Sequence, residues 1–281
     1  MPDSDPLPDP KESGHTIPER FAHRIAMSVP DRHNPKLRNV MERVNADDDL
    51  YGMWIAANVT AIERLGMTDH GPVHVKIVTN IAVRLLRLLL DHGVVPDVQK
   101  AYGLSHDDAE VVVALAALLH DVGMSIHRQD HEAFSLFLAR EKLAQILPEI
   151  YDVPTASIIR SEVLHAIIGH RSGGKPLTVE AGVVRIADAL DMARGRSRIP
   201  FEAGSMSIHS ISAAAIDKVD IQPGDKLPVR LIIHMTNSAG VFQVDQLLRD
   251  KLQGSGLEPY IEVEARRDSE TERSLVKTFQ F

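Results

Sequence analysis

The sequence predicts a mainly α-helical protein, in which a helical bundle is followed by a smaller α+β C-terminal subdomain. Long apolar stripes with helical spacing run from about residue 17 to residue 198, with few alternating segments. After Pro200 the pattern changes to short alternating segments around a PGD turn. We therefore expect a tail (1–16), a helical domain (17–198) and an α+β subdomain (199–281).

Composition limits the classes of function. The apolar fraction of 44% is ordinary for a protein that buries a core, and the absence of cysteine excludes disulfides and thiolate metal sites. The net charge of -8 argues against general nucleic-acid binding. The start of the chain shows no signal-peptide pattern, and the longest apolar run, Val83–Val95, is too short to span a bilayer. We expect a soluble, cytoplasmic protein.

The tail and the first helices follow from local composition. The tail mixes proline with acidic residues and has almost nothing to bury, so it is predicted to be disordered. Helices are expected over Asp49–Leu65, from Pro72 to His92, and over Asp107–Asp121, where Gly123 would end the helix. The segment VVVALAALL is apolar on every side, which predicts that this third helix is buried.

Later elements are marked by capping residues. Asp130 can cap a helix over His131–Leu147, and Thr178 can cap another over Val179–Ala193. A helix over Thr155–His170 would lie between them, ending at the loop RSGGKP. In the last part of the chain we expect the following elements: strands at Val219–Ile221, Val229–Met235 and Tyr260–Ala265, and a helix at Val241–Leu252.

The strongest chemical signal is the pair His120–Asp121 at the end of the buried helix. An aspartate among Val, Ala and Leu is costly to bury unless it is paired or bound to a metal. Adjacent helical residues point about 100° apart, so both can reach one metal only where the helix ends. Gly123 would supply that end.

Two further residues extend this pair to three helices. His74 lies near the start of its helix, where a histidine is more often packed or exposed than a ligand. Asp188 lies within VVRIADALD, among apolar neighbours. It is either a carboxylate ligand or the ion-pair partner of Arg185, three residues earlier on the same face.

The order His74, His120–Asp121, Asp188 resembles the HD-domain superfamily of metal-dependent phosphohydrolases. LLHDVG is close to the HD(I/L)G phrase of that family, and VRIADALD to its final phrase. The resemblance covers about residues 70–198. It implies that these positions hold a divalent metal inside a helical bundle.

The resemblance also suggests a second ion. Family members with more than one metal carry one histidine that opens a helix and one or two before a glycine-rich loop, and His131 and His170 are similar to these. His165 is a further candidate, but five residues correspond to about 140° around a helix, so an undistorted helix would not aim His165 and His170 at one ion. His127, in the loop, is the weaker competitor of His131, and His70 is kept as a substrate or supporting residue.

A site of histidine and carboxylate without thiolate suits Mn, Fe, Ni or Co, with Mg less favoured. We expect two ions bridged by Asp121, which would activate a water for attack on phosphorus. The substrate would be a small phosphoester, such as a nucleotide. Positive charge for its phosphate is expected from Lys175 and Arg194, with Arg196 and Arg128 as further candidates.

Two other functions stay open. Some HD-fold proteins are diiron oxygenases, and bound iron with oxygen consumption would identify one. A regulatory HD module would bind a nucleotide without turnover, with the C-terminal subdomain as its output. Nuclease activity is disfavoured by the acidic balance. Because proteins of this family often self-associate, a homodimer is expected by resemblance.

Overall fold

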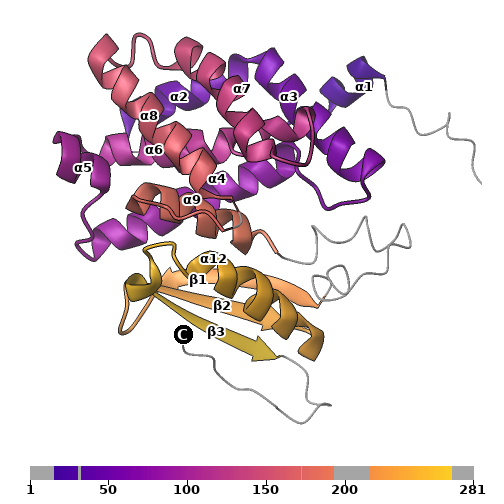
Figure 1. Cartoon of the computed structure of the whole chain (residues 1–281), viewed down its shortest axis with the longest axis vertical. Coiled ribbons are helices and arrows are strands. Elements are labelled where there is room, and N and C mark those ends of the chain that lie inside the picture. Colours follow the sequence, from indigo (N-terminus) through magenta and orange to yellow (C-terminus); the bar gives the residue numbers. More distant parts are fainter. Residues whose placement is uncertain (1–15, 31–32, 172, 193–214, 268–281) are drawn as a thin grey trace, which may run out of the picture.

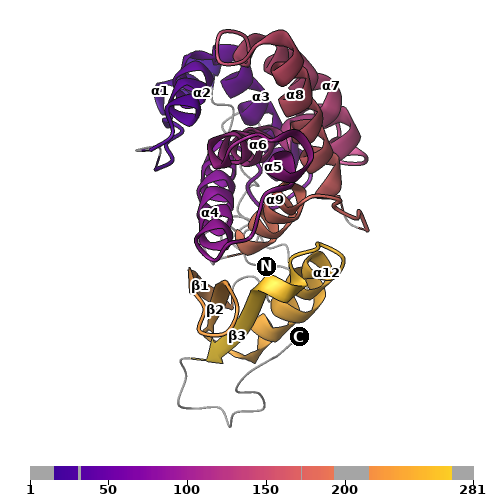
Figure 2. The same cartoon turned by 90° about the vertical axis from the view of Figure 1, so that its left-hand side faces the viewer.

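The computed structural model describes residues 16–30, 33–171, 173–192 and 215–267. In this part of the chain a bundle of helices lies over a small sheet (Figures 1 and 2). The predicted fold class is confirmed: the chain is mainly helical and ends in an α+β unit. The predicted division at residue 198 falls outside the described residues, as does the tail apart from Thr16, which caps α1.

The helices of the bundle follow one another in chain order. They are α1 (Ile17–Ala22), α2 (Pro35–Ala46), α3 (Asp48–Asn58), α4 (Pro72–Asp91), α5 (Asp97–Tyr102), α6 (His106–Leu119), α7 (His131–Ile146), α8 (Val153–Gly169) and α9 (Val179–Leu190). A π-helical turn, η1 (Val59–Arg64), continues α3, and a 3₁₀ turn, η2 (Val122–Ser125), follows α6.

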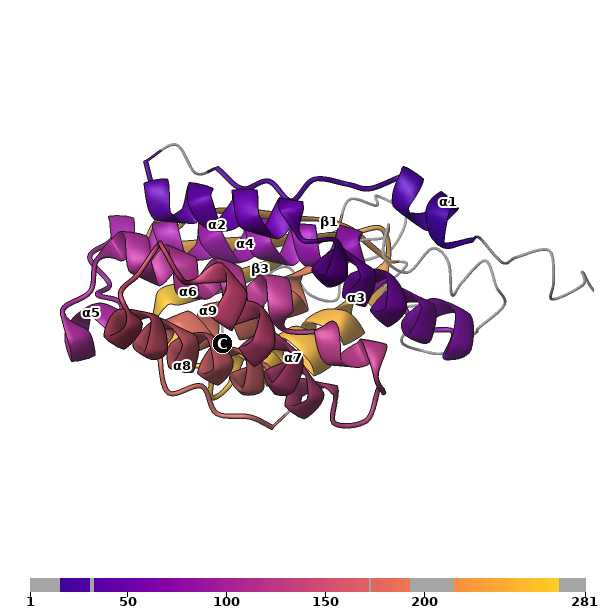
Figure 3. The ribbon, with the colours of Figure 1, turned by 90° about the horizontal axis from the view of Figure 1, so that it is seen from above.

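Helix α6 is the centre of the bundle. Its residues from Asp108 to Leu119 are all buried, as the apolar segment VVVALAALL predicts for most of them. It packs against α2 on one side and α8 on the other, and also against α4 and α9 (Figures 2 and 3). The indole nitrogen of Trp54 donates to the carbonyl of Leu118, 2.9 Å away, which fixes α3 beside the end of α6. The end of α6 is therefore held from several directions.

Several predicted helix ends are confirmed and others are corrected. Pro72 opens α4, and the Thr178 hydroxyl accepts from the Ala181 amide to cap α9. Asp130, however, adopts a left-handed conformation with φ 59° and makes no side-chain cap. Gly123 does not end α6, which stops at Leu119. It lies in η2, where a Cβ would come 2.1 Å from the His131 carbonyl oxygen, so glycine is needed there for close packing.

The C-terminal unit is a three-stranded sheet with a short helical crossover. Strand β1 (Ile216–Pro223) pairs antiparallel with β2 (Val229–Met235), and β3 (Ile261–Arg267) pairs parallel with β2. The crossover contains η4 (Gln243–Leu248) and α12 (Arg249–Leu252), which both pack on α9. Strands β1 and β2 contact α4. No helix in the described part of the chain has both the length and the apolar character needed to cross a membrane.

Candidate metal centre

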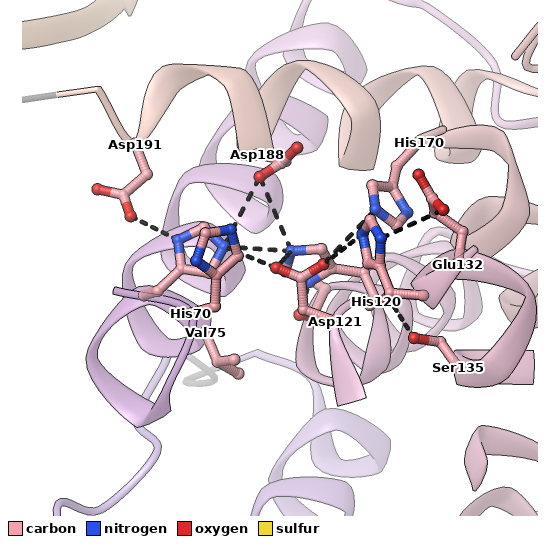
Figure 4. A network of polar contacts seen from close by, with 12 residues as sticks. His70, Val75, His120, Asp121, Glu132, Ser135, His170, Asp188 and Asp191 are labelled. Carbon is pink, nitrogen blue, oxygen red and sulfur yellow. Dashed lines mark hydrogen bonds and ion pairs between the residues drawn. The ribbon is translucent and has the colours of Figure 1, made fainter. Parts of the chain in front are cut away.

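The structure brings most of the predicted ligands to one buried point where α4, α6, α7, α8 and α9 meet. The cluster consists of His74, His120, Asp121, His131, His170 and Asp188. All of them except Asp188 are buried, and the side chain of Asp188 is 18% exposed. Figure 4 shows Asp121 among the imidazole rings, with Asp188 and Asp191 projecting from α9 above them.

The corner after α6 explains how His120 and Asp121 both reach this point. His120 is the last residue with helical angles, and Asp121 leaves the helix with φ -108° and ψ 5°. The hydroxyl of Ser135 on α7 donates to the His120 carbonyl at 2.7 Å and accepts from the Gly123 amide at 2.9 Å. One side chain from α7 therefore fixes the turn that aims the two adjacent residues at the same place.

Asp121 lies at the middle of the cluster, and its two oxygens face different histidines. Oδ2 is 3.4 Å from His74 Nε2 and 3.2 Å from His120 Nε2. Oδ1 is 3.1 Å from His131 Nε2 and 3.7 Å from His170 Nε2. The cluster thus contains two groups that share one carboxylate: His74, His120 and Asp121, and Asp121, His131 and His170.

Hydrogen bonds on the far side of the rings set the protonation of three imidazoles. The Nδ1 atom of His74 lies 2.6 Å from an Asp191 carboxylate oxygen, that of His120 lies 2.8 Å from the Ala117 carbonyl, and that of His170 lies 2.5 Å from the Ile167 carbonyl. Each acceptor takes the proton on Nδ1, so in the neutral form of each ring Nε2 presents a lone pair. At His131, Arg128 brings both its carbonyl and its guanidinium to Nδ1.

The cluster therefore fits a metal cation. The Nε2 atoms of His74 and His120 lie 3.3 Å apart, and both face a carboxylate, which can only accept when it is ionised. Buried acceptors that face one another without a donor are unfavourable unless a cation lies among them. Imidazoles held through Nδ1 by a carboxylate or carbonyl are the usual form of metal-ligating histidine.

Asp188 completes the first group from α9. Its Oδ1 lies 3.6 Å from His74 Nε2 and 3.8 Å from His120 Nε2. The alternative partner considered for it, Arg185, instead donates to main-chain carbonyls, including that of Arg171 at 2.6 Å. The cation hydrogen-bonded to Asp188 is Lys251, whose Nζ lies 3.4 Å from Oδ2.

The electrostatics favour ligand-competent forms of Asp121 and His170. At His131 burial lowers the pKa of the imidazole, but the hydrogen bond and charge of Asp121 outweigh burial and raise it. Burial opposes ionisation of Asp121, but the charge and hydrogen bond of His120, followed by hydrogen bonds from His131 and His74, hold the pKa of this carboxyl well below its usual range in the metal-free protein. The rings can do so only as N–H donors, and a cation bound among neutral rings would take the place of those protons. Burial, with His120 and Lys251 nearby, lowers the pKa of His170 to about 3. At neutral pH Asp121 is ionised and His170 is neutral, as metal ligation requires.

Some predicted residues lie elsewhere. His165 is not in the cluster: its Nε2 accepts from the Leu177 amide at 3.1 Å, and α8 is regular, so it points away from His170. Lys175 is exposed, with no hydrogen bond or ion pair to the described residues. Arg194 and Arg196 lie outside the described residues. Of the predicted cations, Arg128 reaches the centre, with Nη1 2.9 Å from His131 Nδ1.

Two residues at the centre were missed in the sequence. Asp191 orients His74, and the phrase IADALD contains it three residues after Asp188, where the end of α9 brings both carboxylates to the same histidine. Lys251 comes from the C-terminal unit, and no local pattern marks it. His70 stacks near His74, with ring centroids 5.5 Å apart, but belongs to neither group of three.

Comparison with known proteins agrees with this geometry. The family model described as HD domain matches residues 72–193, a range that includes all six residues of the cluster. The chain is also 42% identical, over 214 residues, to the uncharacterized protein MJ1020 of Methanocaldococcus jannaschii. That similarity covers 76% of this chain and 83% of the relative.

The chain belongs to the HD-domain family. HD domains bind divalent metals and are typically metal-dependent hydrolases. The family match ends at residue 193, so Lys251 lies outside it, in the unit that follows the HD domain.

Proposed function

We propose that this HD-domain protein is a hydrolase of small phosphoesters, such as nucleotides, that uses two divalent transition-metal ions sharing Asp121. The proposal rests on the position of the Asp121 carboxylate. Its Oδ2 faces His74 and His120, and its Oδ1 faces His131 and His170. Paired metals bridged in this way are typical of enzymes that hydrolyse phosphoesters.

The residues divide into two ligand sets. His74, His120 and Asp188 would hold the first ion, His131 and His170 the second, and Asp121 both. Imidazole nitrogens with carboxylates suit Mn, Fe, Ni or Co better than Mg. When bound, such ions activate a water and neutralise charge on the phosphoryl oxygens.

The protein's own contribution is orientation and charge. Ser135 fixes the corner that carries His120 and Asp121, and Asp191 fixes the ring of His74. Arg128 lies against His131 and supplies positive charge beside the second group, where an anionic substrate would bind. Lys251 supplies positive charge beside the first. This local charge is compatible with a net charge of -8, which disfavours extended nucleic acid.

Metal content of the purified protein is the first test. We expect about two equivalents of Mn, Fe, Ni or Co per chain, and loss of both in Asp121→Ala because that carboxylate is shared. His92→Ala is the matched control for the histidine ligands, since His92 is exposed at the end of α4, the helix that carries His74. One equivalent, retained in His131→Ala, would reduce the centre to its first group.

A panel of phosphoesters then separates the functions. Metal-dependent phosphate release from a nucleotide or sugar phosphate, absent in Asp121→Ala, would support the proposal. Bound iron with oxygen consumption and no phosphate release would identify an oxygenase instead. Nucleotide binding without turnover at any metal loading would identify a regulatory module. The expected homodimer would be measured on the same preparation by sedimentation.

A further inference from the structure

The C-terminal unit contributes a side chain to the centre. Lys251 on α12 donates from Nζ to the His170 carbonyl at 2.6 Å and to Asp188 Oδ2 at 3.4 Å. Its side chain is 21% exposed, so the ammonium is largely removed from water. His170 is the C-cap of α8, where a cation also favours the negative end of the helix. One lysine therefore joins the ends of α8 and α9, and it contacts one residue from each ligand group.

The position of Lys251 is fixed by the packing of α12 on α9. The buried guanidinium of Arg185 donates to the Lys251 carbonyl at 2.8 Å and to the Asp250 carbonyl at 3.2 Å. A Cβ at Gly182 would lie 2.5 Å from the Ser255 carbonyl oxygen, so only glycine permits this close approach of α9 to the segment after α12. The contact between the two units is therefore close and specific where Lys251 enters.

The two carboxylate oxygens of Asp188 therefore have different partners. Oδ2 is held by Lys251, and Oδ1 faces the Nε2 atoms of His74 and His120. We propose that Lys251 is a positioning residue for the metal centre, which makes Asp188 a one-oxygen ligand and so ties metal affinity to the docking of the C-terminal unit. This inference rests on the proposed metal-dependent function.

Two effects of Lys251 on a metal ion have opposite signs. As a positive charge close to the ligands it would repel a cation, so its loss would strengthen binding. As the partner that orients Asp188 it favours binding, and loss of such partners typically weakens metal affinity about 10- to 100-fold. We expect orientation to dominate, because the ammonium lies on Oδ2 and leaves Oδ1, the oxygen that faces His74 and His120, available to a metal ion.

The test is Mn²⁺ titration of the full-length protein, with free Mn²⁺ followed by electron paramagnetic resonance. Lys251→Met should weaken the first-group affinity by about 10- to 100-fold. Lys251→Arg, which retains a charged donor for Asp188, should recover part of that loss. Arg249→Met is the matched control: it removes the same charge from the same helix, at a side chain that pairs with Asp245 and is 46% exposed. It should bind Mn²⁺ as the wild type does.

Thermal unfolding in chelator separates positioning from a structural role. If Lys251→Met lowered the metal-free melting temperature but left the Mn²⁺ affinity of the folded protein unchanged, Lys251 would be structural and the inference wrong. Unchanged or tighter binding, or an arginine variant no better than methionine, would also overturn it. A wild type that binds no Mn²⁺, Fe²⁺, Ni²⁺ or Co²⁺ would instead refute the proposed function itself.

Discussion

The two ends of α6 each bury a carboxylate, and the contrast between them distinguishes a structural charge from a ligand. Asp108, in the first turn, is 2% exposed, and Asp121, just beyond the last turn, is 4% exposed. Asp108 is surrounded by donors: Lys36 at 2.6 Å, the Tyr151 hydroxyl at 2.8 Å and the Ser105 hydroxyl at 2.7 Å. Asp121 is surrounded by imidazole nitrogens, of which three are held as acceptors by their Nδ1 partners.

The surroundings of Asp108 indicate a structural charge, and those of Asp121 indicate a metal ligand. Burial raises the cost of ionising Asp108, but Lys36, Ser105 and Tyr151 outweigh it and lower the pKa of this carboxyl. Its hydrogen bonds are complete within the protein. At Asp121 the fold collects acceptors that satisfy one another only around a cation. Such a site costs stability until its ligand is bound, which is common where function opposes stability.

The largest expected effect is a loss of stability on replacing Asp108, the buried carboxylate in the first turn of α6. Asp108→Ala removes the carboxylate that accepts from Lys36, Ser105 and Tyr151, and leaves the largely buried Tyr151 hydroxyl without its acceptor. Because Lys36 is partly exposed and can be solvated, we expect a loss of about 3 kcal/mol in the free energy of unfolding. Urea unfolding measured by circular dichroism checks this. Asp107→Ala, the adjacent and less buried carboxylate, should change stability by no more than about 1 kcal/mol.

The lowered pKa of Asp108 also predicts how the stability of the protein changes with pH. The folded-state pKa of Asp108 lies below its ordinary value of 3.8, so its contribution is present above pH 3.8 and is lost as the pH falls through the lower folded value. Acid unfolding of Asp108→Ala should therefore be less steep than that of the wild type below pH 3.8. Equal slopes would contradict the assignment of Asp108 as a stabilising charge.

Metal addition should stabilise the protein through Asp121, just beyond the last turn of α6, and not through Asp108 in its first turn. At a concentration 100 times its dissociation constant, Mn²⁺ should stabilise the wild type by about 2.7 kcal/mol per site. Asp121→Ala should show no such stabilisation, measured by thermal unfolding with and without chelator. Asp108→Asn, although less stable, should retain it in full. A metal-induced shift in Asp121→Ala equal to that of the wild type would place the metal elsewhere.

These two ends were not equally visible in the sequence. An aspartate after VVVALAALL is a mismatch that indicates Asp121, and the resemblance to the HD family implies His74, His131, His170 and Asp188. The structure places these side chains together, because each lies at or near a helix terminus that meets the end of α6. Asp108 was not singled out, since a helix N-terminus rich in acid is ordinary.

What the sequence could not predict depends on packing between distant segments. Lys251 is 63 residues from Asp188, and only the docking of α12 on α9 brings them together. The prediction that Gly123 ends α6 is wrong: the helix stops at Leu119, and glycine is required at 123 because α7 packs closely against it. His165 was retained as a ligand although its helical angle opposed it, and the structure shows the angle to be decisive.

A smaller effect is expected from the partner of His74. Asp191→Ala removes the carboxylate that holds Nδ1 at 2.6 Å and frees the ring to rotate or change tautomer. We expect Mn²⁺ affinity to fall about 10- to 100-fold, while the ligands themselves stay in place. Asp91→Ala, an exposed carboxylate at the end of α4, is the control. Undiminished affinity in Asp191→Ala would show that His74 needs no external orientation.

The smallest expected effect compares Asp121→Asn with Asp108→Asn, because the two substitutions should change the free energy of unfolding in opposite directions. In chelator, Asp121→Asn replaces a carboxylate among lone pairs by an amide that can donate to His120 or His131. At alkaline pH, where the rings carry no positive charge, we expect the metal-free protein to gain up to about 1 kcal/mol in the free energy of unfolding. Asp108→Asn should lose stability under the same conditions, because the amide nitrogen places a donor opposite either Lys36 and Tyr151 or Ser105. A loss at both positions would mean that the cluster is already satisfied by its own protons, and the argument for a cation would fail.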